Sequence, residues 1–151
     1  MAITMGDAAG IGPEIIAKAF RDCPDETAGC FVAGDLAVMR RAARAIGRPH
    51  ELDIPVAVIE TAAQARTLPP RCLGLLQVTE LDAPPRWGAV SACAGRAAAE
   101  SVVWAARAAL RGDIAGLVTA PLNKQALAAA GVAFPGHTEL LQAEAAAGAG
   151  R

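Results

Sequence analysis

Short apolar runs alternate with longer helix-like stretches along the whole chain, and this order constrains the fold more than any other feature. The five apolar runs that we expect to form strands are Ala2–Met5, Cys30–Ala33, Pro55–Ile59, Leu73–Val78 and Ile114–Val118. The stretches that we expect to form helices are Pro13–Arg21, Leu36–Ile46, Val90–Leu110, Pro121–Ala130 and Glu139–Ala147. Strands that alternate with helices predict an α/β fold, a three-layer, mostly parallel sheet with helices on both faces.

Composition narrows how this fold can pack and what it can bind. The chain has 151 residues, enough for one domain with a real core. Hydrophobic residues make up 54% but aromatic residues only 3%, so we expect aliphatic packing and close approach of alanine-rich helices. Arg40, Arg41 and Arg44 are assigned to the exposed side of their helix. A formal net charge of −1 gives no electrostatic reason to expect nucleic acid or an anionic membrane as a partner.

The cysteines and the apolar runs indicate the compartment. The four cysteines, Cys23, Cys30, Cys72 and Cys93, form no C-x-x-C pair, and we interpret them as buried, reduced thiols of a cytosolic protein. No apolar run reaches the roughly 18 residues that a membrane span needs. The first residues lack a basic segment followed by an apolar one, so we expect no signal peptide. The predicted location is therefore the cytoplasm.

A glycine-rich loop, Gly6–Gly12, follows the first expected strand and precedes the helix that Pro13 is expected to start. Ligands of open α/β sheets bind beyond the carboxyl ends of the strands, and backbone N–H groups near a helix start can hold an anion. The pattern is neither a Walker loop nor a dinucleotide fingerprint, because Ile15 stands where the third glycine would be. The loop is either an anion site or only a tight turn.

A second loop, Thr119–Lys124, follows the last expected strand, which we expect to be buried on both faces. Pro121 is a suitable first residue for the helix that follows. Lys124 then falls in the first turn, where its charge opposes the helix dipole. A bound anionic group near Thr119 and Lys124 would remove this misfit, and the alternative is a solvated lysine on an exposed face.

A third loop, Pro135–Glu139, precedes the last expected helix. Thr138 is a plausible N-cap, Glu139 suits the first turn, and Gly136 allows the backbone to turn His137 outward. The alternative is that His137 only hydrogen-bonds within its own loop. His50 lies beside Pro49 in a polar segment, and we interpret it as a surface residue without a functional role.

Four motifs occur in a fixed order along the chain. They are M-G-D-A-A-G-I-G-P-E-I, A-G-D, V-T-A-P-L-N-K and F-P-G-H-T-E-L-L, and they run from Met5 to Leu141 within a match that spans Ile3 to about Leu141. This arrangement resembles the 4-hydroxythreonine-4-phosphate dehydrogenase family of vitamin B6 synthesis, with its relatives that act on D-threonate or D-erythronate 4-phosphate. The first motif is also similar to the glycine loop of isocitrate and isopropylmalate dehydrogenases, whose fold the resemblance implies here.

The resemblance implies an NAD- or NADP-dependent oxidation of a phosphorylated four-carbon hydroxy acid such as 4-phosphooxy-L-threonine, after which carbon dioxide can be lost. It implies a divalent metal (Zn, Mg, Mn or Co) in the full-length enzyme, which acts as a Lewis acid. His137 and Thr138 correspond to the family's substrate-binding His-Thr pair. Asp7, Thr119 and Lys124 are weaker candidates for the same cleft, and no residue is assigned as catalytic. Full-length members are expected to be cytoplasmic homodimers.

One departure from the family limits what this sequence can do. Family members are longer, and their metal-binding histidines and further substrate-binding residues lie beyond the G-H-T-E motif. His50 and His137 are the two histidines of this sequence, so a site of three histidines cannot be built within one chain. We therefore expect residues 1–151 to be the N-terminal part of a dehydrogenase, an incomplete domain that is oligomeric or prone to aggregate. The alternatives are a non-catalytic remnant, a split-enzyme subunit, and a purely structural α/β domain.

Overall fold

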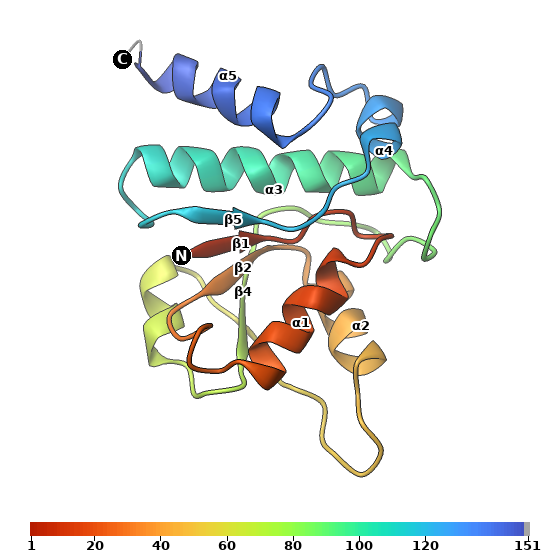
Figure 1. Ribbon diagram of the computed structural model, residues 1–151, viewed down its shortest axis with the longest axis vertical. Helices are drawn as coiled ribbons and strands as arrows, with labels where there is room; N and C mark the ends of the chain where they lie inside the picture. The colour runs from red at the N-terminus through yellow and green to blue at the C-terminus, as the bar shows by residue number, and fades with distance from the viewer. Residues whose placement is uncertain (150–151) are drawn as a thin grey trace.

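Five parallel strands form one sheet in the order β3-β4-β2-β1-β5 (Figure 1). The computed structural model describes residues 1–149. The strands are β1 (Ala2–Thr4), β2 (Phe31–Gly34), β3 (Val56–Val58), β4 (Leu73–Gln77) and β5 (Leu117–Thr119). Each strand overlaps the apolar run that predicted it, and the central strands β2 and β4 are largely buried, as expected of parallel strands with both faces covered. The prediction of a mostly parallel α/β sheet is confirmed.

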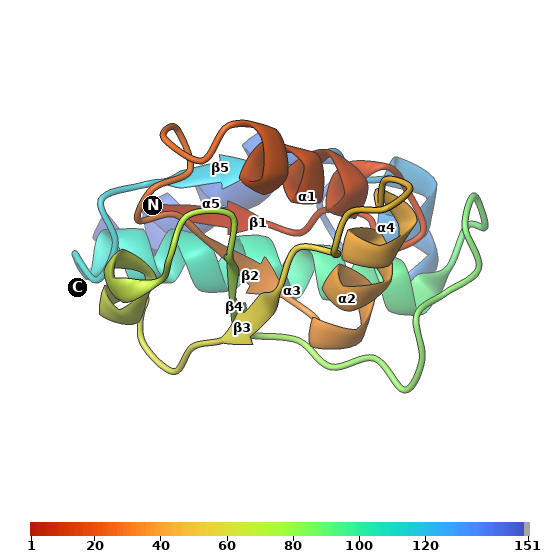
Figure 2. The same cartoon turned by 90° about the horizontal axis from the view of Figure 1, so that it is seen from below.

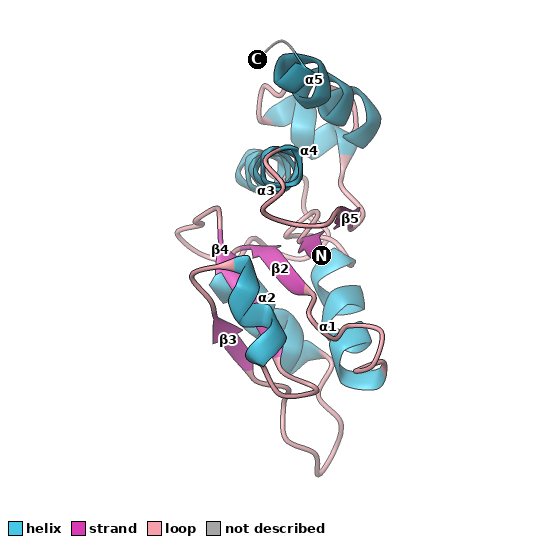
Figure 3. Ribbon diagram, turned by 90° about the vertical axis from the view of Figure 1, so that its left-hand side faces the viewer, coloured by secondary structure: helices cyan, strands magenta, loops and turns pink. Residues whose placement is uncertain are grey.

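Helices cover both faces of this sheet. They are α1 (Gly12–Asp22), α2 (Leu36–Ala45), α3 (Ala92–Leu110), α4 (Lys124–Ala129) and α5 (His137–Ala149), and a 3₁₀-helix, η1 (Ala62–Thr67), precedes β4. Figure 2 looks onto the face covered by α1 and α2, and α3 crosses the opposite face. The helices α4 and α5 pack on α3 and not on the sheet, so they add an outer layer to the expected three (Figure 3).

Successive side chains of β2 point to opposite faces of the sheet and pack in different hydrophobic clusters. Val32 packs in the larger cluster with Met5, Phe20 and Met39, under α1 and α2. Phe31 points to the other face and meets Trp104 of α3 edge-on, with ring centroids 6.1 Å apart. A small third cluster, which includes Val102, Leu127 and Leu140, joins α3 to α4 and α5. None of the helices within residues 1–149 is both long and apolar enough to cross a membrane.

Three local expectations are wrong. The last strand begins three residues later than expected and is an edge strand, with Val118 47% exposed, because nothing pairs with its outer side within residues 1–149. Helix α4 begins at Lys124 and not at Pro121, because the side chain of Asn123 caps it by accepting from the backbone N–H groups of Gln125 and Ala126. Helix α5 begins at His137, so Thr138 is not its N-cap.

Two assignments of burial also need correction. All four cysteines are unpaired, as expected, but Cys72 alone is buried, while Cys23 is exposed and the other two are half-buried. Arg41 is not on the exposed side of α2: its side chain is half-buried, whereas Arg40 and Arg44 are exposed. The sequence predicted the same exposure for all three arginines because helical spacing puts them on the polar side of this helix.

Glycine at position 95 is what allows α4 to approach α3. A Cβ at Gly95 would lie 2.0 Å from the backbone oxygen of Ala126. We predict that Gly95→Ala destabilises the chain by roughly 1–3 kcal/mol through overpacking. The sign is diagnostic, because removing a glycine from a helix interior normally stabilises it by roughly 0.5–1 kcal/mol.

Urea unfolding followed by circular dichroism measures this effect. Gly116→Ala is the matched control, because a Cβ there meets nothing within 4 Å, and it should change stability by no more than about 0.5 kcal/mol. Equal unfolding midpoints for Gly95→Ala and the wild type would show that α3 and α4 are not in close contact.

Candidate functional site

The carboxyl ends of β1 and β5 lie side by side, and the chain leaves them in opposite directions (Figure 1). The segment after β1 enters α1 on one face of the sheet, while the segment after β5 enters α4, which packs on α3 beyond the other face. Such a switch point opens a crevice at the carboxyl edge, and this is where open α/β sheets bind ligands. The topology therefore directs the search for a site to the loops that follow these two strands.

The glycine loop packs directly against the second loop. Gly6 has φ +73°, and a Cβ there would lie 2.4 Å from the backbone oxygen of Pro121. The backbone N–H of Asp7 donates to that same Pro121 oxygen at 2.9 Å. A Cβ at Gly12 would lie 2.8 Å from the oxygen of Met5. Close backbone packing alone is thus enough to require two of the three glycines of this loop.

The side chain of Asp7 holds the turn together. It is 6% exposed, and its Oδ1 accepts from the backbone N–H of Ala9 at 2.9 Å. The N–H of Gly10 donates to the backbone oxygen of Asp7 at 3.0 Å. Three N–H groups of the loop, those of Asp7, Ala9 and Gly10, therefore already have acceptors within the chain, which favours the tight-turn interpretation over an anion cradle.

The second and third loops together enclose a shallow pocket. It has a volume of about 380 Å³ and is lined by Pro121, Leu122, Lys124, Gly136, His137, Thr138 and Glu139. The three motif loops thus converge, as the sequence predicts, because the glycine loop contacts Pro121 from the other side. Asp7 and Thr119 are not among the lining residues, and Asp7 is instead buried beneath the pocket wall.

His137 is the most unusual polar group of this pocket. It is half-buried, and its Nε2 is buried without a hydrogen-bond partner among residues 1–149. Burial lowers the pKa of His137, and the backbone of Ala120 acts in the opposite direction. The imidazole is therefore mostly neutral near pH 7, and its Nε2 is left without a partner among residues 1–149.

The groups around His137 add a positive charge and a hydroxyl. Lys124 is exposed and is the first residue of α4, where its charge opposes the dipole of that helix, as expected. Thr138 is exposed in the first turn of α5. An anionic ligand would find a cation, a hydroxyl donor and an imidazole within one opening.

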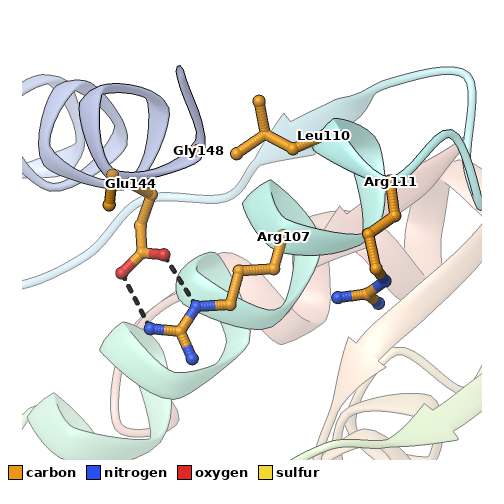
Figure 4. Close-up of a pocket in the computed structure, with 6 residues that line it drawn as sticks. Arg107, Leu110, Arg111, Glu144 and Gly148 are labelled. Atoms are coloured by element: carbon orange, nitrogen blue, oxygen red, sulfur yellow. Dashed lines mark hydrogen bonds and ion pairs between the residues drawn. The ribbon is translucent and has the colours of Figure 1, made fainter. Parts of the chain in front are cut away.

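An ion pair fixes α5 against α3. Figure 4 shows Arg107 of α3 and Glu144 of α5, where Nε donates to Oε2 at 2.7 Å and Nη2 donates to Oε1 at 3.2 Å. Leu110 lies against Gly148 one turn further along, and a Cβ at Gly148 would come within 3.0 Å of it. The cavity drawn in Figure 4 is lined from α5 by Glu144, Ala147 and Gly148, toward the opposite end of that helix from His137.

Residues 1–149 hold no group of three or more histidine, cysteine, aspartate or glutamate side chains that could bind a metal ion. The divalent metal implied by the resemblance therefore does not fit a site built from this chain. The chain has no dinucleotide fingerprint for a nicotinamide cofactor, because Ile15 stands where the third glycine would be. The glycine loop also packs closely, since a Cβ at Gly6 would meet Pro121 and a Cβ at Gly12 would meet Met5. Sequence reasoning missed Asn123, whose signal is an asparagine three residues before Ala126 at the start of an apolar stretch.

Comparison with known proteins decides the family. The model of the family described as pyridoxal phosphate biosynthetic protein PdxA matches residues 26–149. The chain belongs to the PdxA family. The resemblance inferred from the four motifs is confirmed.

Relatives of this PdxA chain carry two substrate names. It is 42% identical to a 4-hydroxythreonine-4-phosphate dehydrogenase of Beijerinckia indica, over 93% of this chain and 40% of that protein. It is 43% identical to a D-threonate 4-phosphate dehydrogenase of Salmonella typhimurium, over 93% of this chain and 42% of that protein. A crystal structure of 4-hydroxythreonine-4-phosphate dehydrogenase from Klebsiella pneumoniae superposes with a TM-score of 0.84 at 38% identity, covering 95% of this chain and 43% of that one. The PdxA chain thus spans about two fifths of the length of these relatives.

The lowered pKa of His137 gives a testable dependence of stability on pH. Because the folded chain disfavours the imidazolium, the unfolded chain binds more protons between the lowered pKa and the ordinary value of 6.5. We predict that the free energy of unfolding falls as the pH falls through this window and that His137→Asn reduces this slope. Nuclear magnetic resonance titration of the imidazole and urea unfolding at several pH values are the measurements.

His50→Asn is the matched control for this PdxA chain. His50 is exposed at φ 67°, a conformation that asparagine tolerates, and the variant assigns the remaining imidazole signal to His137. Because it keeps His137, it must retain the part of the slope that His137→Asn removes. A midpoint for His137 at or above 6.5 would contradict the buried environment.

Proposed function

We propose that this chain is the N-terminal part of an NAD(P)-dependent, divalent-metal-requiring dehydrogenase. Its proposed substrate is a phosphorylated four-carbon hydroxy acid such as 4-phosphooxy-L-threonine, in vitamin B6 synthesis. The observation that carries this proposal is the pocket of Lys124, His137 and Thr138 at the switch point of a chain that the PdxA family model matches. The ordered motifs and the dehydrogenase names of its relatives support the same reaction class.

D-Threonate 4-phosphate, or D-erythronate 4-phosphate, is the second candidate substrate. A relative named for D-threonate 4-phosphate is as similar to this chain as one named for 4-hydroxythreonine 4-phosphate, at 43% and 42% identity. Both molecules carry a phosphate, a carboxylate and an oxidisable hydroxyl. Lys124 could attract either anion, so the pocket favours the shared chemistry over one of the two names.

The residues of this chain would bind and orient the substrate. Lys124 would attract one anionic group, and the hydroxyl of Thr138 would donate a hydrogen bond to it. The neutral imidazole of His137 would bond a substrate hydroxyl through the Nε2 that lacks a partner among the described residues. When bound, the nicotinamide accepts the hydride. No step is assigned to the metal, because its ligands are not among residues 1–149.

The proposed context follows from the same relatives. Four unpaired cysteines suit a reducing compartment, so the cytoplasm is the proposed location. A homodimer is the proposed assembly of the full-length protein, and the exposed outer side of β5 is one surface that would need covering. The alternative proposal is a non-catalytic remnant or split-enzyme subunit that keeps the substrate pocket without the metal site.

Supplying the rest of the enzyme as a separate polypeptide tests this proposal. We predict that the purified chain alone does not reduce NAD⁺ or NADP⁺ with either substrate and any of the four metals. Addition of the part of the Beijerinckia indica relative that this chain does not span should restore reduction. In that assembly His137→Ala should lower kcat/KM roughly 100-fold or more, on the scale of a lost acid–base or orienting group.

His50→Ala in the same assembly is the control and should match the wild type, because His50 is exposed and does not line the pocket. Substrate preference is measured as the ratio of kcat/KM for the two acids. A folded complex that reduces neither cofactor would support the non-catalytic alternative.

A further inference from the structure

The side chain of Arg41 points from α2 to the glycine loop and not to solvent. Its Nη2 donates to the backbone oxygen of Ala8 at 2.7 Å, and its Nη1 donates to the backbone oxygen of Pro85. The guanidinium also lies over the ring of Trp87, with Cζ 4.7 Å from the ring centroid. One side chain therefore joins α2, the glycine loop and the segment 84–88.

Arg41 makes these contacts as a partly desolvated cation. Burial lowers the pKa of Arg41, and Glu14 acts on it only as a more distant charge. Among residues 1–149 no carboxylate lies within ion-pair distance of Arg41, so its donors go to backbone carbonyls. An arginine is normally kept in such a place when its planar fork satisfies fixed acceptors and an aromatic face at once. Arg40, next to it on α2, is exposed and serves as a natural comparison.

The carbonyl of Ala8 lies in a buried part of the glycine loop, where water cannot supply a hydrogen-bond donor. Ala8 is 0% exposed and Ala9 is 2% exposed. The backbone oxygen of Ala9 accepts from the N–H of Gly88 at 2.7 Å, which docks the segment 84–88 onto the same two residues. Without Arg41, a buried carbonyl would lose its donor and the segment would lose its second attachment.

The glycine loop connects the contacts of Arg41 to the pocket of His137. Asp7, the residue before Ala8, donates its N–H to Pro121, which lines the pocket of His137. The glycine loop is therefore held from both sides, by Pro121 at one side and by Arg41 with Gly88 at the other. A shift of Ala8 would be passed to Pro121 through a single residue.

We propose that Arg41 is a positioning residue: it sets the glycine loop and the segment 84–88 against each other and thereby fixes the wall of the substrate pocket. The structural half of this proposal concerns the loop alone. Its consequence for turnover rests on the proposed function. The two halves are separated by measurements that do and do not need an active enzyme.

Hydrogen exchange of the 151-residue chain, followed by mass spectrometry, tests the structural half. In Arg41→Met, which keeps the stem and removes the fork, exchange of residues 6–12 and 84–89 should accelerate at least tenfold, while β4 and α3 keep wild-type rates. Arg41→Lys keeps the charge but offers no planar fork, so it should give an intermediate rate. Arg40→Met should match the wild type.

Fluorescence of Trp87 gives a second readout that a general loss of stability would not imitate. In a Trp104→Phe background Trp87 is the one emitter, because the sequence holds two tryptophans. Trp87 is 51% exposed, so Arg41→Met should shift its emission only slightly to the red, and the main expected change is easier quenching by a soluble quencher. Trp87→Leu, which leaves the half-buried guanidinium of Arg41 in place, should loosen residues 84–89 but not residues 6–12.

Turnover in the complemented assembly tests the functional half, with kcat expected to fall at least tenfold in Arg41→Met and to recover partly in Arg41→Lys. Unchanged exchange and emission in both variants would overturn the proposal. A loosened loop with wild-type turnover would overturn the positioning role. An inactive wild-type assembly would instead remove the proposed function, and exchange would still decide whether Arg41 sets the loop.

Discussion

The contact between the ends of β1 and β5 is the constraint on which the rest of this structure depends. Gly6 can pass the carbonyl of Pro121 only because it has no side chain, and the N–H of Asp7 then bonds that carbonyl. This contact fixes the path of the chain out of both strands. It also fixes Ala120, whose backbone acts on His137. A residue with a Cβ at position 6 would have to separate the two loops before it could be accommodated.

Much of the fold could be predicted because burial leaves a direct trace in the sequence. Apolar runs such as the one at Leu73 mark strands that are covered on both faces, and helix periodicity marks α1, α2 and α3. The position of a strand in the sheet leaves no such pattern, because an apolar run does not show whether another strand pairs with each of its sides. Val118 was therefore expected to be buried. Near the start of α4 the sequence holds two helix-start residues, a proline and an asparagine. Only the hydrogen bonds that Asn123 accepts show that it is the N-cap of this helix.

The candidate site, like the fold, could be predicted from the sequence only in part. Convergence of the three loops follows from topology, because parallel strands bring their carboxyl ends to one edge. The tasks of individual side chains do not follow, since they depend on contacts between residues far apart in sequence. Asp7 turns out to be an acceptor for its own loop, and Arg41 is half-buried against a segment more than forty positions away. His137 was singled out through its place in the ordered G-H-T-E motif, and the structure places it in the lining of the pocket, but its substrate-binding role stays a prediction.

The third hydrophobic cluster has a consequence for how this protein opens. Helix α5 rests on α3 through that small cluster and the Arg107–Glu144 pair, and Arg107 is 61% exposed, while the sheet is held by two larger clusters. Regions with few buried apolar contacts unfold locally at a lower free energy than the core. We therefore expect the helix that begins with His137 to open locally more readily than the sheet. A ligand that needs His137 in place would bind the closed population and protect α5, so that occupancy of the pocket and order of the helix become one linked equilibrium.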